Sequence, residues 1–226
     1  MNTPDKILVW DLPVRVFHAL LALSFFGAFI TAESERWARV HIALGYTVAG
    51  LVAFRLLWGL LGTRTARFAS FVRSPRAAWA YLKSLLGPRP QHHVGHNPAG
   101  GWAIVGLLGL ALVTTLSGWL QFNDLGPGWL EDLHEGAANT MMGLVALHIA
   151  AVAFSAWRHR DGLVQAMVTG RKPGHPGDTG IGRAWRPLGV LLLVGVLGFW
   201  GWEWSHPPAP MDSAQAPSLR HDKDDD

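Results

Sequence analysis

Five long apolar stretches dominate this chain of 226 residues and limit what it can fold into. Each is near the length of about 20 residues that an α-helix needs to cross a lipid bilayer. Because unpaired backbone N–H and C=O groups are not tolerated in hydrocarbon, each stretch is expected to form a helix. The predicted spans are residues 14–32, 40–61, 99–121, 133–156 and 187–204. The expected fold class is therefore an all-α integral membrane bundle.

The composition agrees with a membrane protein. Only 15% of the residues are charged, whereas soluble domains carry about a quarter. The chain has 12 Trp and 2 Tyr, and Trp is favoured where the membrane meets water. It has no Cys, which excludes disulfides, thiolate metal sites, iron–sulfur clusters and covalently attached haem. The net charge of +3 does not indicate a nucleic-acid partner, because the Lys and Arg residues lie between the apolar stretches.

The basic residues predict how the five helices are oriented. With alternating crossings, the Arg- and Lys-rich segments 62–98 and 157–186 lie on the same side as the N-terminus. The loop after the first helix has only Arg36 and Arg39, and the loop after the third has no basic residue. The expected location is a bacterial inner membrane. The positive-inside rule places the N-terminus on its cytoplasmic side and the C-terminal tail on its periplasmic side. Membrane lipid is accordingly an expected partner.

Four histidines fall within or at the ends of the predicted helices, where an ionisable side chain is costly and usually functional. His134 and His148 are 14 residues apart on one helix. That spacing separates them by about 21 Å along the axis and leaves them within roughly 40° of one face. His41 matches the depth of His134 at the outer side, and His18 matches His148 at the inner side. The predicted pairs are therefore His41 with His134 and His18 with His148.

Each predicted pair has the ligands that one haem iron needs, because two neutral imidazoles can fill both of its axial positions. Histidines also bind zinc and copper, so a haem-free metal transporter is an alternative that the spacing leaves open. No Asp or Glu accompanies the four histidines in the interior of the spans, because Glu135 lies only at the outer end of its helix. Their absence weakens a cation pathway and favours an apolar haem pocket.

Arg55 lies inside the second predicted helix, 14 residues after His41, and is therefore on a similar face near the inner surface. A buried arginine needs an anion, and the propionates of an inner haem are one candidate partner. Snorkelling of the side chain to the cytoplasmic headgroups is an equally favoured interpretation. For Arg15, in the first helix, snorkelling is favoured over a propionate.

Three further residues have candidate roles near the predicted sites. Arg36 and Arg39 precede the second helix, where they could bind the propionates of an outer haem, guide a small anion, or pair with Glu33 and Glu35. His96 precedes the third helix, near where an inner haem would reach the surface. A solvated histidine is the favoured interpretation of His96, and proton exchange with a quinone is the alternative.

Several motifs between residues 7 and 173 resemble the prokaryotic cytochrome b561 family, which also includes the cytochrome b subunits of nickel–iron hydrogenases. The motifs are VWDLPVRVFH at 9–18, HIALGY at 41–46, FRLLWGLLGT at 54–63, RF to SP at 67–75, GHNPAG at 95–100, LHE at 133–135, LHI at 147–149 and MVTG at 167–170. The resemblance implies a four-helix bundle with two non-covalent b haems. The four ligand positions of the family fall on His18, His41, His134 and His148.

The resemblance also implies a function in a respiratory chain. Family members move electrons across the membrane between a quinone, as a diffusible substrate, and a partner on the outer face. That partner can be a c-type cytochrome or a hydrogenase, and some relatives oxidise superoxide and reduce ubiquinone. The expected function is electron transfer through two haems in series. The inner haem is expected to exchange electrons with a quinone near Arg15, Arg55 and His96. Whether the chain is an enzyme, a superoxide:quinone oxidoreductase, is left open by the sequence.

Three regions are expected along the chain. Residues 1–173 form the cytochrome b561-like membrane domain, 174–205 an inner linker with a fifth transmembrane helix, and 206–226 a disordered outer tail. The tail is rich in Pro, Ala and Ser, a composition typical of disorder, and ends in an acidic run. Shorter family members lack residues 174–226. This segment shows no firm match to the hydrogenase cytochrome b subunits. A periplasmic c-type cytochrome is therefore the leading hypothesis for the partner.

Overall fold

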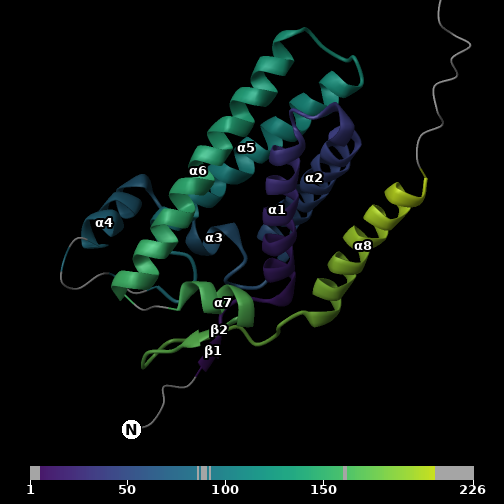
Figure 1. Ribbon diagram of the computed structural model, residues 1–226. Helices are drawn as coiled ribbons and strands as arrows, with labels where there is room; N and C mark the ends of the chain where they lie inside the picture. Colours follow the sequence, from purple (N-terminus) through teal and green to yellow (C-terminus); the bar gives the residue numbers. More distant parts are fainter. Residues whose placement is uncertain (1–5, 86, 88–90, 92, 160–161, 207–226) are drawn as a thin grey trace, which may run out of the picture.

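The computed structural model describes residues 6–85, 87, 91, 93–159 and 162–206, and the side chains of 158 and 159 are not among the described parts. Helices form most of the described chain (Figure 1). In chain order the elements are β1 (Lys6–Leu8), α1 (Leu12–Thr31), the short 3-10 helix η1 (Glu35–Trp37), α2 (Ala38–Leu61), α3 (Phe68–Phe71), α4 (Pro75–Leu85), α5 (Pro98–Phe122), α6 (Trp129–His159), α7 (Leu163–Thr169), β2 (Arg171–Pro173) and α8 (Arg186–Ser205).

Five of these helices, α1, α2, α5, α6 and α8, are long and apolar enough to cross a membrane. The predicted all-α membrane bundle with a fifth spanning helix is therefore confirmed. The largest difference is at the start of α6, which begins at Trp129 instead of residue 133. Two starts are fixed by side-chain caps followed by proline: Asp11 Oδ1 accepts from Val14 N at 2.9 Å, and Asn97 Oδ1 accepts from Gly100 N at 2.7 Å.

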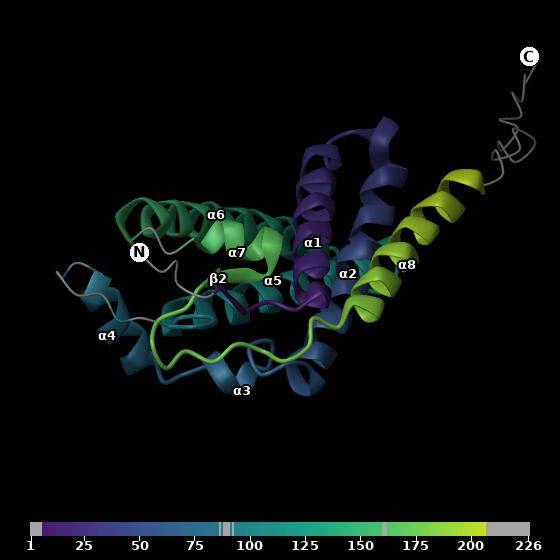
Figure 2. The same ribbon diagram turned by 90° about the horizontal axis from the view of Figure 1, so that it is seen from below.

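The four helices of the core form two antiparallel pairs, α1 with α2 and α5 with α6, and α2 packs against α5. The fifth helix, α8, packs mainly on α1 and stands on the side away from α5 and α6 (Figures 1 and 2). The contact with α1 is close because position 189 is glycine: a Cβ there would lie 2.6 Å from Leu12 Cγ. Farther along α8, Trp200 Nε1 donates to Thr47 Oγ1 of α2 at 2.9 Å.

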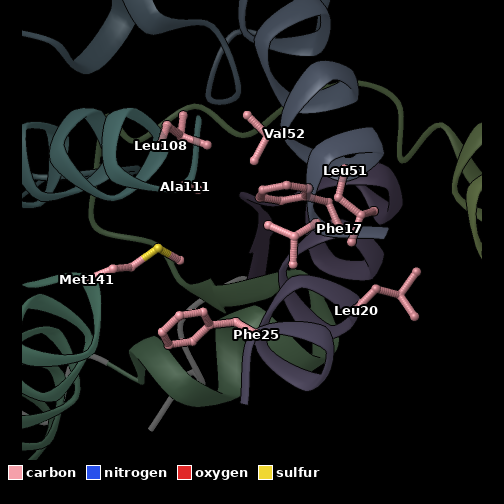
Figure 3. Packing of buried hydrophobic residues seen from close by; sticks show 9 residues of the cluster. Phe17, Leu20, Phe25, Leu51, Val52, Leu108, Ala111 and Met141 are labelled. Carbon is pink, nitrogen blue, oxygen red and sulfur yellow. The ribbon is translucent and has the colours of Figure 1, made fainter. Parts of the chain in front are cut away.

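Apolar side chains from α1, α2, α5 and α6 meet in the middle of the bundle (Figure 3). Phe25 of α1, Leu51 of α2 and Leu108 of α5 are members of this core, and Met141 joins it from α6. Met141 is buried, at 3% exposed, and lies seven residues from both His134 and His148. An apolar layer therefore lies between the two histidine positions of α6.

A small antiparallel sheet closes one end of the bundle. β1 pairs with β2, with Ile7 opposite Lys172, and the carbonyl of Gly170 accepts from the backbone N–H groups of Val9 and Trp10. We term this end, with β1, β2, α3 and α7, the sheet end. The opposite end, with η1 and residues 123–128, is termed the loop end. Residues 170–184 are thus tied to the N-terminal segment, a pairing that hydropathy does not reveal.

Candidate functional site

The structure brings His41 and His134 together at the loop end. Their ring centroids lie 6.0 Å apart, with the ring planes at 71°. With metal–nitrogen bonds of about 2 Å, two imidazoles on opposite sides of one metal ion have centroids roughly 6 Å apart. The spacing therefore fits the axial ligand pair of a single iron.

Backbone carbonyls determine which nitrogen of each ring is protonated. His41 Nδ1 lies 2.9 Å from the carbonyl oxygen of Ala28, and His134 Nδ1 lies 2.8 Å from that of Thr114. A carbonyl only accepts, so Nδ1 must carry the proton in both neutral rings. Each Nε2 then has a lone pair, and within the described residues neither Nε2 forms a hydrogen bond. This tautomer is the one that metal-bound histidines use, with a carbonyl fixing the ring orientation.

A glycine lets α5 approach His134. A Cβ at position 118 would lie 2.7 Å from both Cε1 and Nδ1 of the His134 ring. Any other residue at 118 would therefore push the ring away from its place. The sequence shows Gly118 only as a small residue in a membrane helix, where close packing is the ordinary explanation.

His18 and His148 form the second predicted pair, towards the sheet end. His18 is in the second turn of α1 with an exposed side chain, and His148 is half-buried in α6. Among the described residues no group of three or more His, Cys, Asp or Glu side chains gathers to hold a metal ion. Two imidazoles at each predicted site would match the axial set of a bis-histidine haem.

Arg55 is enclosed by aromatic rings near the sheet end. Its side chain is 3% exposed, and its guanidinium lies 4.8 Å from the ring centroid of Phe68 and 5.9 Å from that of Phe71. Its Nη1 atom is buried and has no hydrogen-bond partner among the described residues. The side chain therefore does not snorkel to the surface, which was one of its two predicted roles.

His96 is held between two aromatic rings. Its ring centroid lies 4.4 Å from those of Trp10 and Phe71, and its Nδ1 is buried without a hydrogen-bond partner. Burial lowers the pKa of His96 to about 3, and the positive charge of Arg55 acts in the same direction. The solvated histidine favoured by the sequence is wrong, because residues distant in sequence cover the ring.

Asp11 is a buried carboxylate that the sequence reasoning missed. It is 0% exposed, and besides capping α1 it accepts from Trp58 Nε1 at 3.1 Å and Thr63 Oγ1 at 2.5 Å. These bonds fasten the start of α1 to the end of α2. An Asp before Leu-Pro signals a helix cap, but nothing local shows that its second oxygen is used by another helix.

Arg15 caps the end of α7. Its Nε donates to the carbonyl of Met167 at 3.2 Å, and its Nη2 donates to that of Val168. Cationic side chains often bind the last carbonyls of a helix in this way. The structure therefore gives Arg15 a partner within the chain, and its predicted role at a cofactor or quinone stays a prediction.

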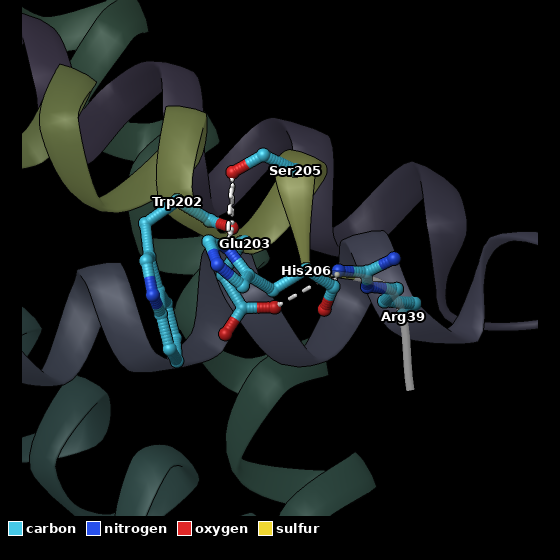
Figure 4. Close-up of polar contacts among 5 residues, drawn as sticks. All are labelled: Arg39, Trp202, Glu203, Ser205 and His206. Carbon is cyan, nitrogen blue, oxygen red and sulfur yellow. Dashed lines mark hydrogen bonds and ion pairs between the residues drawn. The ribbon is translucent and has the colours of Figure 1, made fainter. Parts of the chain in front are cut away.

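The two arginines before α2 have different surroundings. Arg39 pairs with Glu203 of α8 at 3.7 Å, and its Nη2 donates to the carbonyl of His206 at 2.9 Å (Figure 4). Its acidic partner is thus Glu203, not Glu33 or Glu35. Arg36 has its guanidinium 5.7 Å from the ring centroid of Trp37. Roles for these arginines at a haem or an anion path stay predictions.

One comparison with known proteins gives a match. The family model described as prokaryotic cytochrome b561 matches residues 9–170. This stretch begins just after β1, ends just before β2, and contains both histidine pairs. No curated protein and no solved structure matches the chain.

Proposed function

Because this chain belongs to the prokaryotic cytochrome b561 family, whose members are membrane b-type cytochromes of electron transfer, we propose that it holds two b haems in series. We further propose that it carries electrons between the quinone pool and a periplasmic redox partner. The observation that supports this best is the pair of His41 and His134, with each Nδ1 on a carbonyl and each Nε2 available. His41 and His134 would hold the haem at the loop end, and His18 and His148 the haem at the sheet end.

The residues around the pairs suit electron transfer. Each histidine pair would hold a haem that supplies one-electron chemistry, and two imidazoles would leave its iron no open position for oxygen. The carbonyls of Ala28 and Thr114 orient the two loop-end imidazoles and raise their basicity. The apolar layer around Met141 excludes water between the two ends of α6, and burial of this kind tunes haem potentials.

The charge distribution supports an orientation. The sheet end carries the basic segments between α2 and α5 and between α6 and α8, so we place it in the cytoplasm of a bacterium. His41 and His134 then lie towards the periplasm, where a c-type cytochrome is the partner that we propose. A quinone would exchange electrons from the bilayer near His18 and His148.

Haem content tests the two-haem proposal. The purified wild-type protein is expected to show a b-type α band and two haems per chain in a pyridine haemochrome assay. The variant His148→Ala should hold one, because its partner His18 alone leaves one axial position empty. His175→Ala removes an exposed histidine outside both pairs and should keep two. A wild-type spectrum without the α band would favour the haem-free transporter, and an unchanged ratio in His148→Ala would contradict the ligand assignment.

Stopped-flow measurement of haem reduction tests which of the two haems accepts electrons from quinol. Decylubiquinol should reduce both haems of the wild-type protein, and a soluble c-type cytochrome should reoxidise them. In His148→Ala the remaining loop-end haem should be reduced far more slowly, because its nearest electron donor is gone. Equal rates in variant and wild type would show that quinol reaches the loop end directly.

A further inference from the structure

Two buried polar atoms near the sheet end have no partner, and they belong to neighbouring side chains. Arg55 Nη1 and His96 Nδ1 are both buried and form no hydrogen bond within the described residues. Both side chains lie against the ring of Phe71, whose centroid is 4.4 Å from that of the His96 ring and 5.9 Å from the Arg55 guanidinium. Buried polar groups are nearly always hydrogen-bonded, so a pair of such atoms side by side calls for a ligand.

We propose that Arg55 and His96 together bind one carboxylate, a propionate of the haem held by His18 and His148. This inference rests on the proposed function and adds the anchoring site of that haem. A guanidinium presents parallel N–H donors that match a carboxylate, and the neutral His96 imidazole adds one further donor in the tautomer that carries its proton on Nδ1. The expected acceptor is therefore an anionic oxygen pair that reaches both side chains.

The location of the two side chains identifies the ligand. Arg55 lies 14 residues after His41 in α2, and His148 lies 14 residues after His134 in α6. Because the rings of His41 and His134 meet at the loop end, the constant rise of a helix brings Arg55 to about the depth of His148. The site is therefore at the level of the proposed sheet-end haem. A propionate is the anionic part of that haem, and it is covalently fixed at the edge of the ring.

The described carboxylates do not supply the missing anion. Asp11 is near enough for its charge to act on Arg55. Its two oxygens, however, already accept from Val14 N, Trp58 Nε1 and Thr63 Oγ1. Arg55 forms no ion pair with a described carboxylate, and a buried charge without a partner is strongly unfavourable.

The aromatic rings hold the two donors in place. Trp10 and Phe71 enclose the His96 ring from two sides, and Phe68 lies over the guanidinium of Arg55. Position 59 must be glycine for this packing, since a Cβ there would lie 2.0 Å from Phe68 Cε2. The donors are thus preorganised, and His96 is assigned to the haem instead of to a quinone.

Redox titration of the purified dihaem protein tests this site. The wild type should show two one-electron transitions, and the transition that is lost in His148→Ala identifies the sheet-end haem. Arg55→Gln and His96→Phe should each shift that transition to lower potential, because an uncompensated carboxylate stabilises the ferric state. His96→Phe keeps a ring between Trp10 and Phe71 but removes the donor. Arg55→Lys and His96→Gln retain a donor and should shift the transition less.

A double variant asks whether the two side chains share one carboxylate. The shift in Arg55→Gln/His96→Phe should differ from the sum of the single shifts, because interacting partners are not additive. The propionate bending band in resonance Raman spectra should also change in both single variants. Arg64→Gln removes an exposed charge that binds Thr179 at the same end, and it should leave both transitions in place.

Several outcomes would overturn the inference while leaving the two-haem proposal intact. One is that both redox potentials stay unchanged in the Arg55 and His96 variants. The others are a shift in the potential of the loop-end haem and additive shifts in the double variant. A changed KM for decylubiquinol in His96→Phe, with both potentials unmoved, would assign His96 to the quinone. Wild-type protein without two haems would instead refute the proposed function itself. If Arg55→Gln does not fold, the potentials of the Arg55→Lys and His96→Phe variants still test the inference.

Discussion

The imidazole rings of His41 and His134 stand 6.0 Å apart, centroid to centroid, and each ring has its Nδ1 on a carbonyl of a neighbouring helix. The carbonyl of Ala28 belongs to α1 and that of Thr114 to α5. Two helices that carry neither of these histidines thus set the orientation of both rings. All four core helices take part in this site, although only α2 and α6 supply its imidazoles.

The first prediction concerns this pair. His41→Ala and His134→Ala should each lower the haem content from two to one per chain, because one imidazole does not hold a bis-histidine haem. The double variant should retain the same single haem, since both singles already lose the same group. A pyridine haemochrome assay measures the ratio. A double variant with no haem would show that the two histidines serve different haems.

The second prediction concerns Gly118. In Gly118→Ala the new methyl group would lie 2.7 Å from two atoms of the His134 ring, so the ring must move. We expect loss or weakening of the loop-end haem alone, seen as a changed α band and a lower haem ratio. Gly109→Ala is the control on the same helix, because its Cβ would meet no heavy atom within 4 Å. Equal haem ratios in both variants would contradict the close approach.

The third prediction concerns Asp11. Asp11→Ala removes the cap of α1 and leaves the donors of Trp58 and Thr63 without an acceptor. With about 1 kcal/mol for the cap and about 1–3 kcal/mol for unsatisfied donors, the free energy of unfolding should fall by about 2–4 kcal/mol. Asp11→Asn retains one oxygen and should lose less. Thermal unfolding in detergent measures both, and an unchanged Tm in Asp11→Ala would contradict the prediction.

The fourth prediction concerns the contact between α2 and the end of α8. The side chains of Arg39 and Glu203 are 37% and 30% exposed, so their ion pair should contribute less than about 1 kcal/mol. A double-mutant cycle with Arg39→Gln and Glu203→Gln, followed by thermal unfolding, measures the coupling. We expect a small favourable coupling that decreases at high salt. A coupling above 2 kcal/mol, on the scale of about 3–5 kcal/mol for breaking a buried pair, would contradict this assignment.

The spanning helices could be predicted because hydropathy is a local property. Four of the five predicted starts lie within two residues of the observed helix starts. The start of α6 differs because its first turn contains the acidic pair Glu131 and Asp132. The depths of the four histidines followed from the constant rise of a helix. The sequence therefore placed His41 beside His134, which the ring distance of 6.0 Å agrees with.

The partners of polar side chains could not be predicted in the same way. The sequence offers Glu33 and Glu35 as nearby partners of Arg39, yet Arg39 pairs with Glu203. The sequence favours a solvated His96, yet the rings of Trp10 and Phe71 pack against it. These contacts join segments separated by many residues. The local sequence pattern does not show which of several distant segments of similar composition a given side chain contacts.

The sequence by itself determined how many times the chain crosses the membrane and at which depth each histidine lies. Both follow from apolar length and from a fixed rise per residue, which do not depend on neighbouring helices. Only the tertiary structure decided the tautomers of His41 and His134, the burial of Arg55 beside His96, and the double use of Asp11. Each of these requires the donors, acceptors and rings of separate helices to meet, and hydrogen bonds act only over about 3 Å.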